Sequence, residues 1–176
     1  VDVTNFFTVD FCRPLHVFDF EKIEGDITIR YSKKHEIFLG LDEVEYTLAE
    51  GLVVICDKKG IISLAGIMGG LRTACDFDTQ NVLLESAYFT PDSISLAGRK
   101  LNISSDARYR FERGVDPMST HDGIDLATKM ILENCGGKVG SIVKDDEYKK
   151  KSKIITIDKN EINTILGTQI SESFIK

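Results

Sequence analysis

Two apolar runs, Leu52-Val53-Val54-Ile55-Cys56 and Ile61-Ile62-Ser63-Leu64-Ala65, flank the polar turn Asp57-Lys58-Lys59-Gly60. Short runs rich in β-branched residues on either side of a glycine-containing turn are typical of a β-hairpin. A third run, Ile27-Thr28-Ile29-Arg30-Tyr31, alternates apolar and polar residues, as a strand with one buried face does. Val82-Leu83-Leu84 opens a further buried strand, which we expect to run to about Phe89.

Helical signals are fewer than strand signals. Thr90-Pro91-Asp92 supplies an N-cap, a proline at the first helical position and an acidic first turn, and it predicts a short helix ending near Gly98. A longer helix is expected from about Ser119 to Cys135, because glycines follow directly. Strands outnumber helices and do not alternate regularly with them. The predicted class is therefore α+β, a strand-rich module of mixed sheets with a few helices.

The C-terminal part of the chain has a different pattern. Residues 144–153 form a charge run without periodicity, which is typical of a solvated linker. Beyond it, Ile154-Ile155-Thr156-Ile157 predicts a strand, Asp158-Lys159-Asn160-Glu161 predicts a capping box, and another helix is expected from Ser171. We predict a domain over residues 1–143, a linker over 144–153, and over 154–176 the truncated start of a second small α/β domain.

Composition excludes several functional classes. Apolar residues make up 42% of the chain and charged residues 28%, as in ordinary soluble proteins, and no apolar run approaches the roughly 20 residues that span a bilayer. The net charge of −6 argues against a basic face that would hold nucleic acid unaided. No C-x-x-C pair occurs and no histidine stands at ligand spacing from a cysteine, so we expect no metal site. We predict reduced, buried thiols for Cys12, Cys56, Cys75 and Cys135.

Glu85 is the first residue that is out of place. In the expected strand, Leu83, Glu85, Ala87 and Phe89 share one face, and a carboxylate on an apolar face is costly unless it is paired. Glu85 therefore faces solvent from an edge strand, pairs with Arg110 or Arg113, or lies in a pocket where it binds a polar group or a water.

His16 and a glycine cluster are the next candidates. His16 follows Pro14 and precedes Asp19, which could orient its imidazole for catalysis; the alternative is a core histidine with its hydrogen bonds satisfied. The cluster Ala65-Gly66-Ile67-Met68-Gly69-Gly70 lacks the signatures of a phosphate-binding loop. It is either a bulged turn or a place where a ligand approaches the backbone closely.

Ser104-Ser105-Asp106-Ala107 predicts the N-cap of a short helical turn, and no serine-nucleophile motif is present. Three arginines follow within this turn. We expect them to pair with Glu112 and Asp116, with RNA contact as the alternative; they are Arg108, Arg110 and Arg113.

Five stretches share one order with a known family. They are Val1-Asp2-Val3-Thr4-Asn5, Pro14-Leu15-His16-Val17-Phe18-Asp19, Leu64-Ala65-Gly66-Ile67-Met68-Gly69-Gly70, Asn81-Val82-Leu83-Leu84-Glu85-Ser86-Ala87-Tyr88-Phe89 and Arg110-Phe111-Glu112-Arg113-Gly114-Val115-Asp116-Pro117. In this order they resemble the editing module of the bacterial-type phenylalanyl-tRNA synthetase beta subunit. The resemblance covers residues 1 to about 143, and it implies that the N-terminal edge of the module is missing.

The resemblance implies hydrolysis of tyrosine that has been attached wrongly to phenylalanine tRNA. By position, Glu85 matches the carboxylate that accepts the tyrosine hydroxyl, and the backbone N–H of Gly69 matches its companion donor. His16 and Asn5 match residues that hold the attacking water. Two further positions match the pocket lining near the ester, Ser105 and Ala107.

The family also implies partners that this region lacks. The whole enzyme is a cytoplasmic α2β2 assembly that uses ATP and magnesium in its alpha subunit to attach phenylalanine to tRNA. This region is expected to hold no cofactor and not to aminoacylate by itself. The alternative is a non-catalytic structural and tRNA-positioning module whose editing has decayed.

The sequence departs from the family pattern at four places, which leaves the efficiency of editing open. Ser105 stands where threonine is common, and Cys12-Arg13 replaces a Gly-Gln type pair. Val17 replaces a smaller alanine, and Arg108-Tyr109 replaces a Ser-His type pair.

Overall fold

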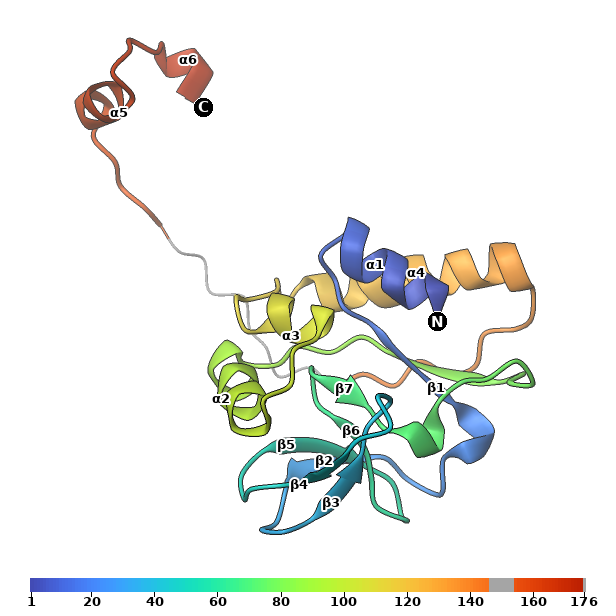
Figure 1. Cartoon of the computed structure of the whole chain (residues 1–176). Coiled ribbons are helices and arrows are strands. Elements are labelled where there is room, and N and C mark those ends of the chain that lie inside the picture. Colours follow the sequence, from blue (N-terminus) through green and yellow to red (C-terminus); the bar gives the residue numbers. More distant parts are fainter. Residues whose placement is uncertain (146–153, 176) are drawn as a thin grey trace. The chain divides into compact units, whose positions relative to one another are not determined.

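The computed structural model describes residues 1–145 and 154–175, so most of the predicted linker lies outside the described residues. The chain divides into two compact units, Val1–Lys144 and Asp145–Lys176. The helices of the first unit are α1 (Asp2–Asp10), α2 (Pro91–Leu101), α3 (Asp106–Phe111) and α4 (Ser119–Cys135), with 3₁₀ turns η1 (Phe20–Lys22) and η2 (Leu71–Thr73) (Figure 1). Its strands are β1 (His16–Asp19), β2 (Thr28–Tyr31), β3 (Ile37–Leu39), β4 (Glu45–Thr47), β5 (Val53–Cys56), β6 (Ile61–Leu64), β7 (Met68–Gly69) and β8 (Val82–Glu85).

A four-stranded antiparallel sheet of order β2-β5-β6-β7 forms the centre of the first unit. The predicted hairpin is confirmed, with Val54 opposite Leu64 and a register shift after Ile55. Its turn is closed by Asp57, whose Oδ1 accepts hydrogen bonds from the N–H groups of Lys59 and Gly60. The expected strand at Ile27 to Tyr31 forms as β2 on the edge of this sheet. Its predicted buried apolar face is wrong, because Ile29 and Tyr31 are exposed.

A separate two-stranded ribbon pairs β1 with β8 and places His16 opposite Glu85. The predicted extension of β8 to Phe89 is wrong, because the strand ends at Glu85. Continued pairing would set Ala87 opposite Pro14, which has no N–H to donate. The Ala87 carbonyl instead accepts a hydrogen bond from the Arg13 guanidinium.

The predicted helix at Thr90 forms as α2, but it does not end near Gly98. It continues to Leu101 and ends at Asn102, whose left-handed conformation lets the Ile103 N–H reach the Gly98 carbonyl. Gly98 is needed inside the helix for another reason. A Cβ there would collide with the side chain of Arg108 from α3, which lies across this turn.

The predicted helix over Ser119 to Cys135 is confirmed as α4, and Gly136 ends it with positive φ. Helix α1 lies along α4 (Figure 1). It was not anticipated from the sequence, because Phe6 and Val9 are exposed and the apolar pattern of this segment does not follow one face. Its contact with α4 is made through a small core of Phe7, Leu15 and Ala127.

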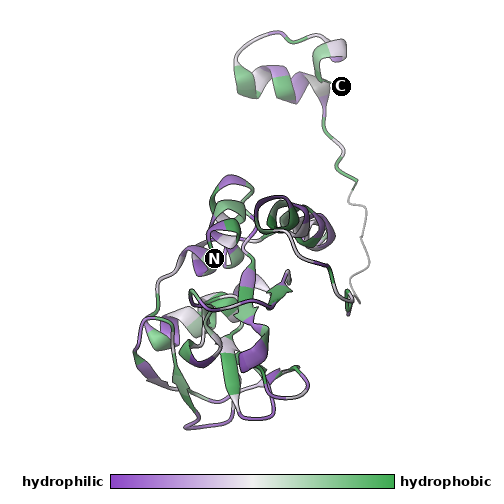
Figure 2. Ribbon diagram, turned by 90° about the vertical axis from the view of Figure 1, so that its right-hand side faces the viewer, coloured by the Kyte–Doolittle hydropathy of each residue, from purple (hydrophilic) through white to green (hydrophobic). Residues whose placement is uncertain are grey.

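The main core lies between the central sheet, the β1–β8 ribbon and helices α2 and α3. Figure 2 shows that strands and helices both carry hydrophobic and hydrophilic residues. The largest fully buried side chains are Phe7, Phe18, Phe38, Leu48, Leu52, Ile62, Leu64, Ile94, Val54 and Thr73. Burying the apolar side chains among these contributes roughly 1.5–3 kcal/mol each, and this burial fixes the strand positions on which a site can be built.

The described residues of the second unit form α5 (Lys159–Leu166) and α6 (Glu172–Ile175). The N-cap part of the predicted capping box is confirmed, since the Asp158 carboxylate accepts from the Asn160 N–H, and Gly167 ends the helix in a left-handed conformation. The reciprocal bond from Glu161 stays a prediction. The predicted strand at residues 154–157 is wrong, because this stretch is irregular. A strand needs a partner for its backbone groups, and the described residues of this unit offer only helices.

Candidate active site

A cavity of about 370 Å³ lies in the first unit, at the junction of α1, the β1–β8 ribbon, the β6–β7 turn and α3. This is a usual size for a small-molecule site. All six residues that the sequence singled out line this one cavity: Asn5, His16, Gly69, Glu85, Ser105 and Ala107. They come from five separate segments of the sequence, which the fold brings together around the cavity. The individual roles expected for them remain predictions.

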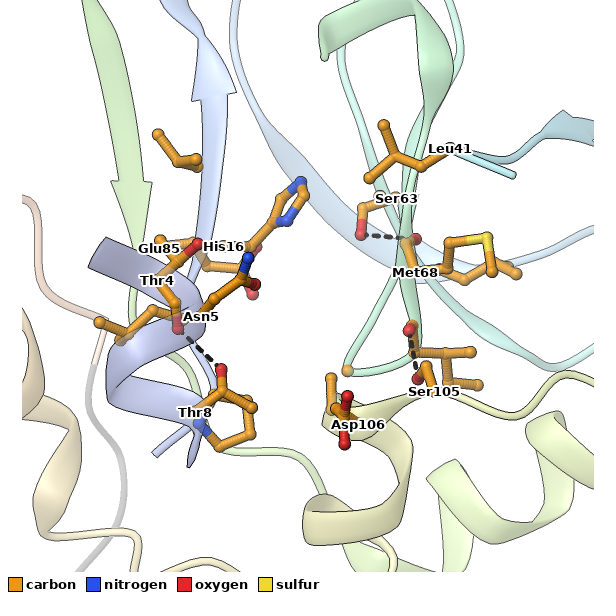
Figure 3. A pocket seen from close by; sticks show the side chains of 18 of the residues that line it. Thr4, Asn5, Thr8, His16, Leu41, Ser63, Met68, Glu85, Ser105 and Asp106 are labelled. Atoms are coloured by element: carbon orange, nitrogen blue, oxygen red, sulfur yellow. Dashed lines mark hydrogen bonds between the residues drawn. The ribbon is translucent and has the colours of Figure 1, made fainter. Parts of the chain in front are cut away.

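Two facing walls divide these residues (Figure 3). Thr4, Asn5, His16 and Glu85 lie on one wall, which α1 and the β1–β8 ribbon provide. The other wall carries polar residues from the central sheet and from α3, including Ser63, Ser105 and Asp106. Asp106 and Met68, which lie on the same wall, were not foreseen as pocket residues, since nothing in the local sequence distinguishes either from a cap or a core residue.

Glu85 is a half-buried residue whose carboxylate lacks the partners expected for it. Its Oε2 atom is buried and receives no hydrogen bond from the described residues. The expected pairing with Arg110 or Arg113 is wrong, because these bond to Asp106 and Glu112. A solvent-facing position is also wrong. Burial raises the pKa of Glu85 to about 7, and attraction to Arg13 opposes that rise.

His16 lies opposite Glu85 and stacks edge-on against Phe18, with ring centroids 4.4 Å apart. Burial lowers its pKa to about 4, so the imidazole is neutral at physiological pH. The His16 ring lies against the backbone of Gly69. A Cβ at position 69 would collide with the ring, so glycine is needed there. The glycine cluster thus forms a turn with Gly66 at φ +68°, and the group that lies close to Gly69 is the His16 ring. Close approach of a ligand stays a prediction.

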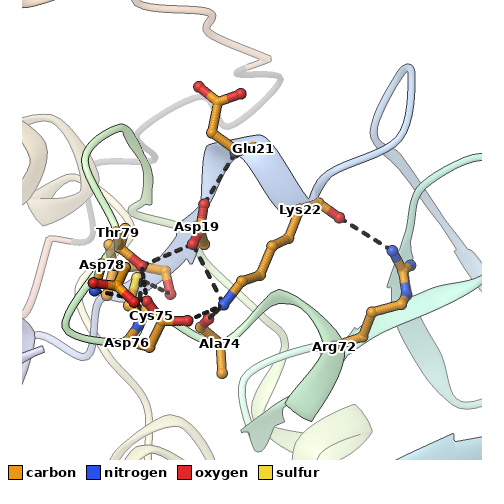
Figure 4. A network of polar contacts seen from close by, with 10 residues as sticks. Asp19, Glu21, Lys22, Arg72, Ala74, Cys75, Asp76, Asp78 and Thr79 are labelled. Carbon is orange, nitrogen blue, oxygen red and sulfur yellow. Dashed lines mark hydrogen bonds and ion pairs between the residues drawn. The ribbon is translucent and has the colours of Figure 1, made fainter.

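Asp19 does not orient His16, contrary to one sequence interpretation. An odd separation of three residues puts the two side chains on opposite faces of β1. Asp19 instead accepts hydrogen bonds from Thr79 Oγ1 at 2.7 Å and from the Glu21 N–H, and it pairs with Lys22 (Figure 4). Lys22 also bonds to Asp76, so this network holds the segment after η2, whose Ala74 and Cys75 line the cavity.

Asn5 reaches the cavity because α1 is a regular helix at this point. The hydroxyls of Thr4 and Thr8 are used within the helix, donating to the carbonyls of Val1 and Thr4. The Asn5 amide, in contrast, lies beside His16 and Glu85 with no such internal use among the described contacts (Figure 3). An amide and a neutral imidazole offer donors and acceptors that can hold a water.

Ser105 has a structural duty on the opposite wall. It is the N-cap of α3, as predicted, accepting from the Arg108 N–H while its hydroxyl donates to the Ile67 carbonyl at 2.7 Å. These two bonds fix α3 to the β6–β7 turn and place Ala107 against the cavity. Of the expected arginine pairs, those with Glu112 form, whereas Asp116 accepts from the Met118 N–H instead.

Other sequence expectations have the following outcomes. All four cysteines are free, but Cys12 and Cys135 are exposed, so the prediction of four buried thiols is wrong for these two. Across residues 1–145 and 154–175, His, Cys, Asp and Glu side chains do not gather in threes at metal-binding geometry. No helix in the described part of the chain combines the length and the apolar character needed to cross a membrane.

The sequence of this α+β module matches a known protein family. The family model described as the B3/4 domain matches residues 1–136, and the chain belongs to this family.

Two curated relatives identify the kind of protein in which such a domain is found. The chain is 47% identical over 173 residues to the phenylalanine–tRNA ligase beta subunit of Ruegeria pomeroyi, covering 98% of this chain and 22% of the relative. It is 46% identical over 171 residues to the corresponding subunit of Paramagnetospirillum magneticum, covering 97% of this chain and 21% of the relative. The predicted family resemblance is confirmed, and the chain spans about a fifth of the length of these relatives.

A solved structure supports the fold. An N-terminal fragment of the phenylalanyl-tRNA synthetase beta subunit from Pyrococcus horikoshii aligns with a TM-score of 0.53 and 17% sequence identity. The alignment covers 98% of this chain and 52% of that fragment. The predicted α+β class, with several antiparallel sheets and a few helices, is confirmed.

Proposed function

We propose that the first unit is an editing domain that hydrolyses tyrosyl-tRNA(Phe), the mischarged product of a phenylalanine–tRNA ligase. The observation that carries this proposal is the Glu85 carboxylate. It lines a cavity of amino-acid size, and its buried Oε2 receives no hydrogen bond from the described residues. A buried acceptor without a donor is destabilising, and the tyrosine hydroxyl supplies the donor that is missing.

Discrimination between tyrosine and phenylalanine explains why such a site is useful. A pocket built for phenylalanine rejects an added hydroxyl by only about 10²-fold. A second site that hydrogen-bonds the hydroxyl reverses the preference, because phenylalanine would leave the buried Glu85 carboxylate unpaired. The editing site therefore selects by polarity, and size plays little part.

The proposed reaction is direct hydrolysis of the ester. A water oxygen attacks the carbonyl carbon, the bond from that carbon to the ribose oxygen breaks, and tyrosine and the free tRNA hydroxyl are released. His16 is suited to accept a hydrogen bond from this water. Its pKa of about 4 makes the imidazole neutral at neutral pH, so one ring nitrogen is unprotonated and can act as the acceptor. Asn5 would hold the same water from α1, and the rate gain would come mainly from positioning.

The remaining expectations concern the whole enzyme. With a net charge of −6, the chain would take part in a larger tRNA-binding assembly that supplies most of the contacts to phosphate. We propose phenylalanine tRNA and a synthetase alpha subunit in an α2β2 enzyme as partners. ATP and magnesium would serve aminoacylation in that alpha subunit, in the cytoplasm.

Two measurements test the proposal. The first titrates free tyrosine and free phenylalanine into this chain by NMR, comparing Glu85→Ala with Glu45→Ala, a matched control at an exposed glutamate on β4. We expect a tyrosine preference that only Glu85→Ala removes. Equal binding of both amino acids by the folded wild-type chain would overturn the proposed selection.

The second measurement follows deacylation of tyrosyl-tRNA(Phe) by the complete two-subunit enzyme. Glu85→Gln should slow it by about 10- to 100-fold, because a hydrogen bond to a charged group contributes roughly 1.5–3 kcal/mol. His16→Ala should lower kcat with little change in KM, since it acts on the water. Normal clearance by both variants would leave the domain with a structural and tRNA-positioning role. A His16→Ala effect confined to KM would place His16 in tyrosine binding.

A further inference from the structure

Arg13 is a buried cation behind the cavity wall. The residue is 2% exposed and lies between α1 and β1. Its guanidinium donates to the Ala87 carbonyl, to Ser86 Oγ at 3.4 Å and to Ser119 Oγ at 3.3 Å. It therefore ties the segment before β1 to the chain just after Glu85 and to the start of α4.

All the hydrogen bonds of this guanidinium go to neutral oxygens. Within the described residues no carboxylate lies within 4.0 Å of it, and its Nε has no hydrogen-bond partner. Burial lowers the pKa of Arg13 to about 10, and Glu85 and Asp116 oppose that change through their charge. The guanidinium thus stays charged at neutral pH, and those two carboxylates are the charges that balance it.

The charge of Arg13 in turn affects the ionisation of Glu85. Burial favours its neutral form, and the electrostatic attraction that opposes this effect comes from Arg13. His16 faces Glu85 across the ribbon but is neutral, so it contributes no charge. The two groups act on each other without a direct hydrogen bond, so Arg13 does not occupy the carboxylate oxygens of Glu85, a residue that lines the cavity.

We propose that Arg13 is a positioning residue that favours the ionised, acceptor-only form of Glu85 and thereby strengthens the preference of the cavity for a phenol hydroxyl. This inference rests on the proposed function. An ionised carboxylate accepts hydrogen bonds only, and it does so about twice as strongly as a neutral group. A direct ion pair would occupy the same oxygens, whereas a cation held behind the strand by neutral oxygens leaves them free.

The experiment compares Arg13→Gln with Arg13→Lys in the 176-residue chain. Glutamine keeps hydrogen-bond donors but removes the charge, and lysine keeps the charge. Arg113→Gln is the matched control, because Arg113 is exposed and bonds to Glu112. For each variant, the ¹³C shift of the Glu85 carboxyl and the affinity for tyrosine are measured by NMR from pH 5 to 9.

Arg13→Gln should move the Glu85 midpoint upward by about one pH unit or more, since a nearby opposite charge shifts a pKa by roughly 1–3 units. A one-unit rise from about 7 lowers the ionised fraction at pH 7 from about one half to about one tenth. Tyrosine binding at pH 7 should then weaken about fivefold and recover at pH 9. Arg13→Lys and Arg113→Gln should keep the wild-type midpoint.

An unchanged Glu85 midpoint in folded Arg13→Gln would overturn the inference. So would a shifted midpoint with unchanged pH dependence of tyrosine binding, because charge would then not govern recognition. If the wild-type chain binds no tyrosine at any pH, the proposed selection fails, and the assignment of Arg13 to specificity fails with it. In that case the carboxyl titration still shows separately whether Arg13 controls the charge of Glu85.

Discussion

Replacing Glu85 with glutamine is expected to stabilise the folded chain at alkaline pH and to leave its stability unchanged at acidic pH. Glutamine has nearly the same shape but does not ionise. The wild-type carboxyl is buried, and burial raises its pKa from the ordinary value of 4.5 to about 7. The native state thus resists ionisation of this group more than the unfolded chain does.

The sign and the size follow from these two pKa values. Between pH 4.5 and about 7 the folded chain keeps a proton that the unfolded chain has lost, so the stability due to Glu85 falls as pH rises. Each unit of difference between the folded and unfolded pKa corresponds to roughly 1.4 kcal/mol. The rise from 4.5 to about 7 therefore lowers the free energy of unfolding by about 3 kcal/mol above pH 7. We expect Glu85→Gln to exceed the wild type by about that amount at pH 8 and to match it near pH 4.

The assay is urea unfolding followed by circular dichroism between pH 4 and 8.5, with exposed Glu45→Gln as the matched control. His16 contributes in the opposite direction, because burial lowers its pKa from 6.5 to about 4 and stability falls as pH drops through that range. This contribution is common to all three proteins and cancels in the difference from wild type. A difference independent of pH, or a less stable Glu85→Gln at pH 8, would refute the reasoning.

Three further outcomes are expected. Gly69→Ala should weaken tyrosine binding at least about tenfold in the NMR titration, because its methyl group collides with the His16 ring; unchanged affinity would contradict this geometry. Asp57→Ala should lower the free energy of unfolding by about 2–4 kcal/mol, since it removes the two-bond pair with Arg72, and urea unfolding measures this loss. Ser105→Ala should lower it by about 1–2 kcal/mol in the same assay, whereas Ser105→Thr should restore it; equal stability of all three would exclude the capping role.

Local sequence signals predicted the elements that are decided locally. The hairpin around Asp57, the cap at Ser105 and helix α4 depend on turn chemistry, capping and a glycine stop, and all three formed as expected. Errors arose where a distant residue decides. Strand β8 ends at Glu85 because of Arg13 and Pro14, and Gly98 lies inside α2 because Arg108 from another helix packs over it. The residues that neighbour Glu85 and Gly98 in the sequence do not reveal these distant contacts.

Only part of the candidate site was predictable from the sequence. Glu85 could be singled out because a carboxylate breaks an apolar pattern, but its charge partner could not, since Arg13 lies 72 residues away and makes no direct ion pair with it. The expectation that Asp19 orients His16 failed on strand geometry, which the sequence alone did not define. Helix α1 was missed, and with it the reason that Asn5 reaches the cavity.

Three destabilising features lie at or beside the cavity. The Oε2 atom of Glu85 is buried without a donor, His16 is half-buried in its neutral form, and Arg13 is a buried cation with only neutral hydrogen-bond partners. Asp57 shows that this fold can satisfy a buried carboxylate, since it accepts from three backbone N–H groups and from Arg72. A protein that can satisfy a buried carboxylate this completely has no structural need for an unsatisfied one. The Glu85 oxygen that receives no hydrogen bond from the described residues therefore supports the proposed binding of a ligand donor at this position.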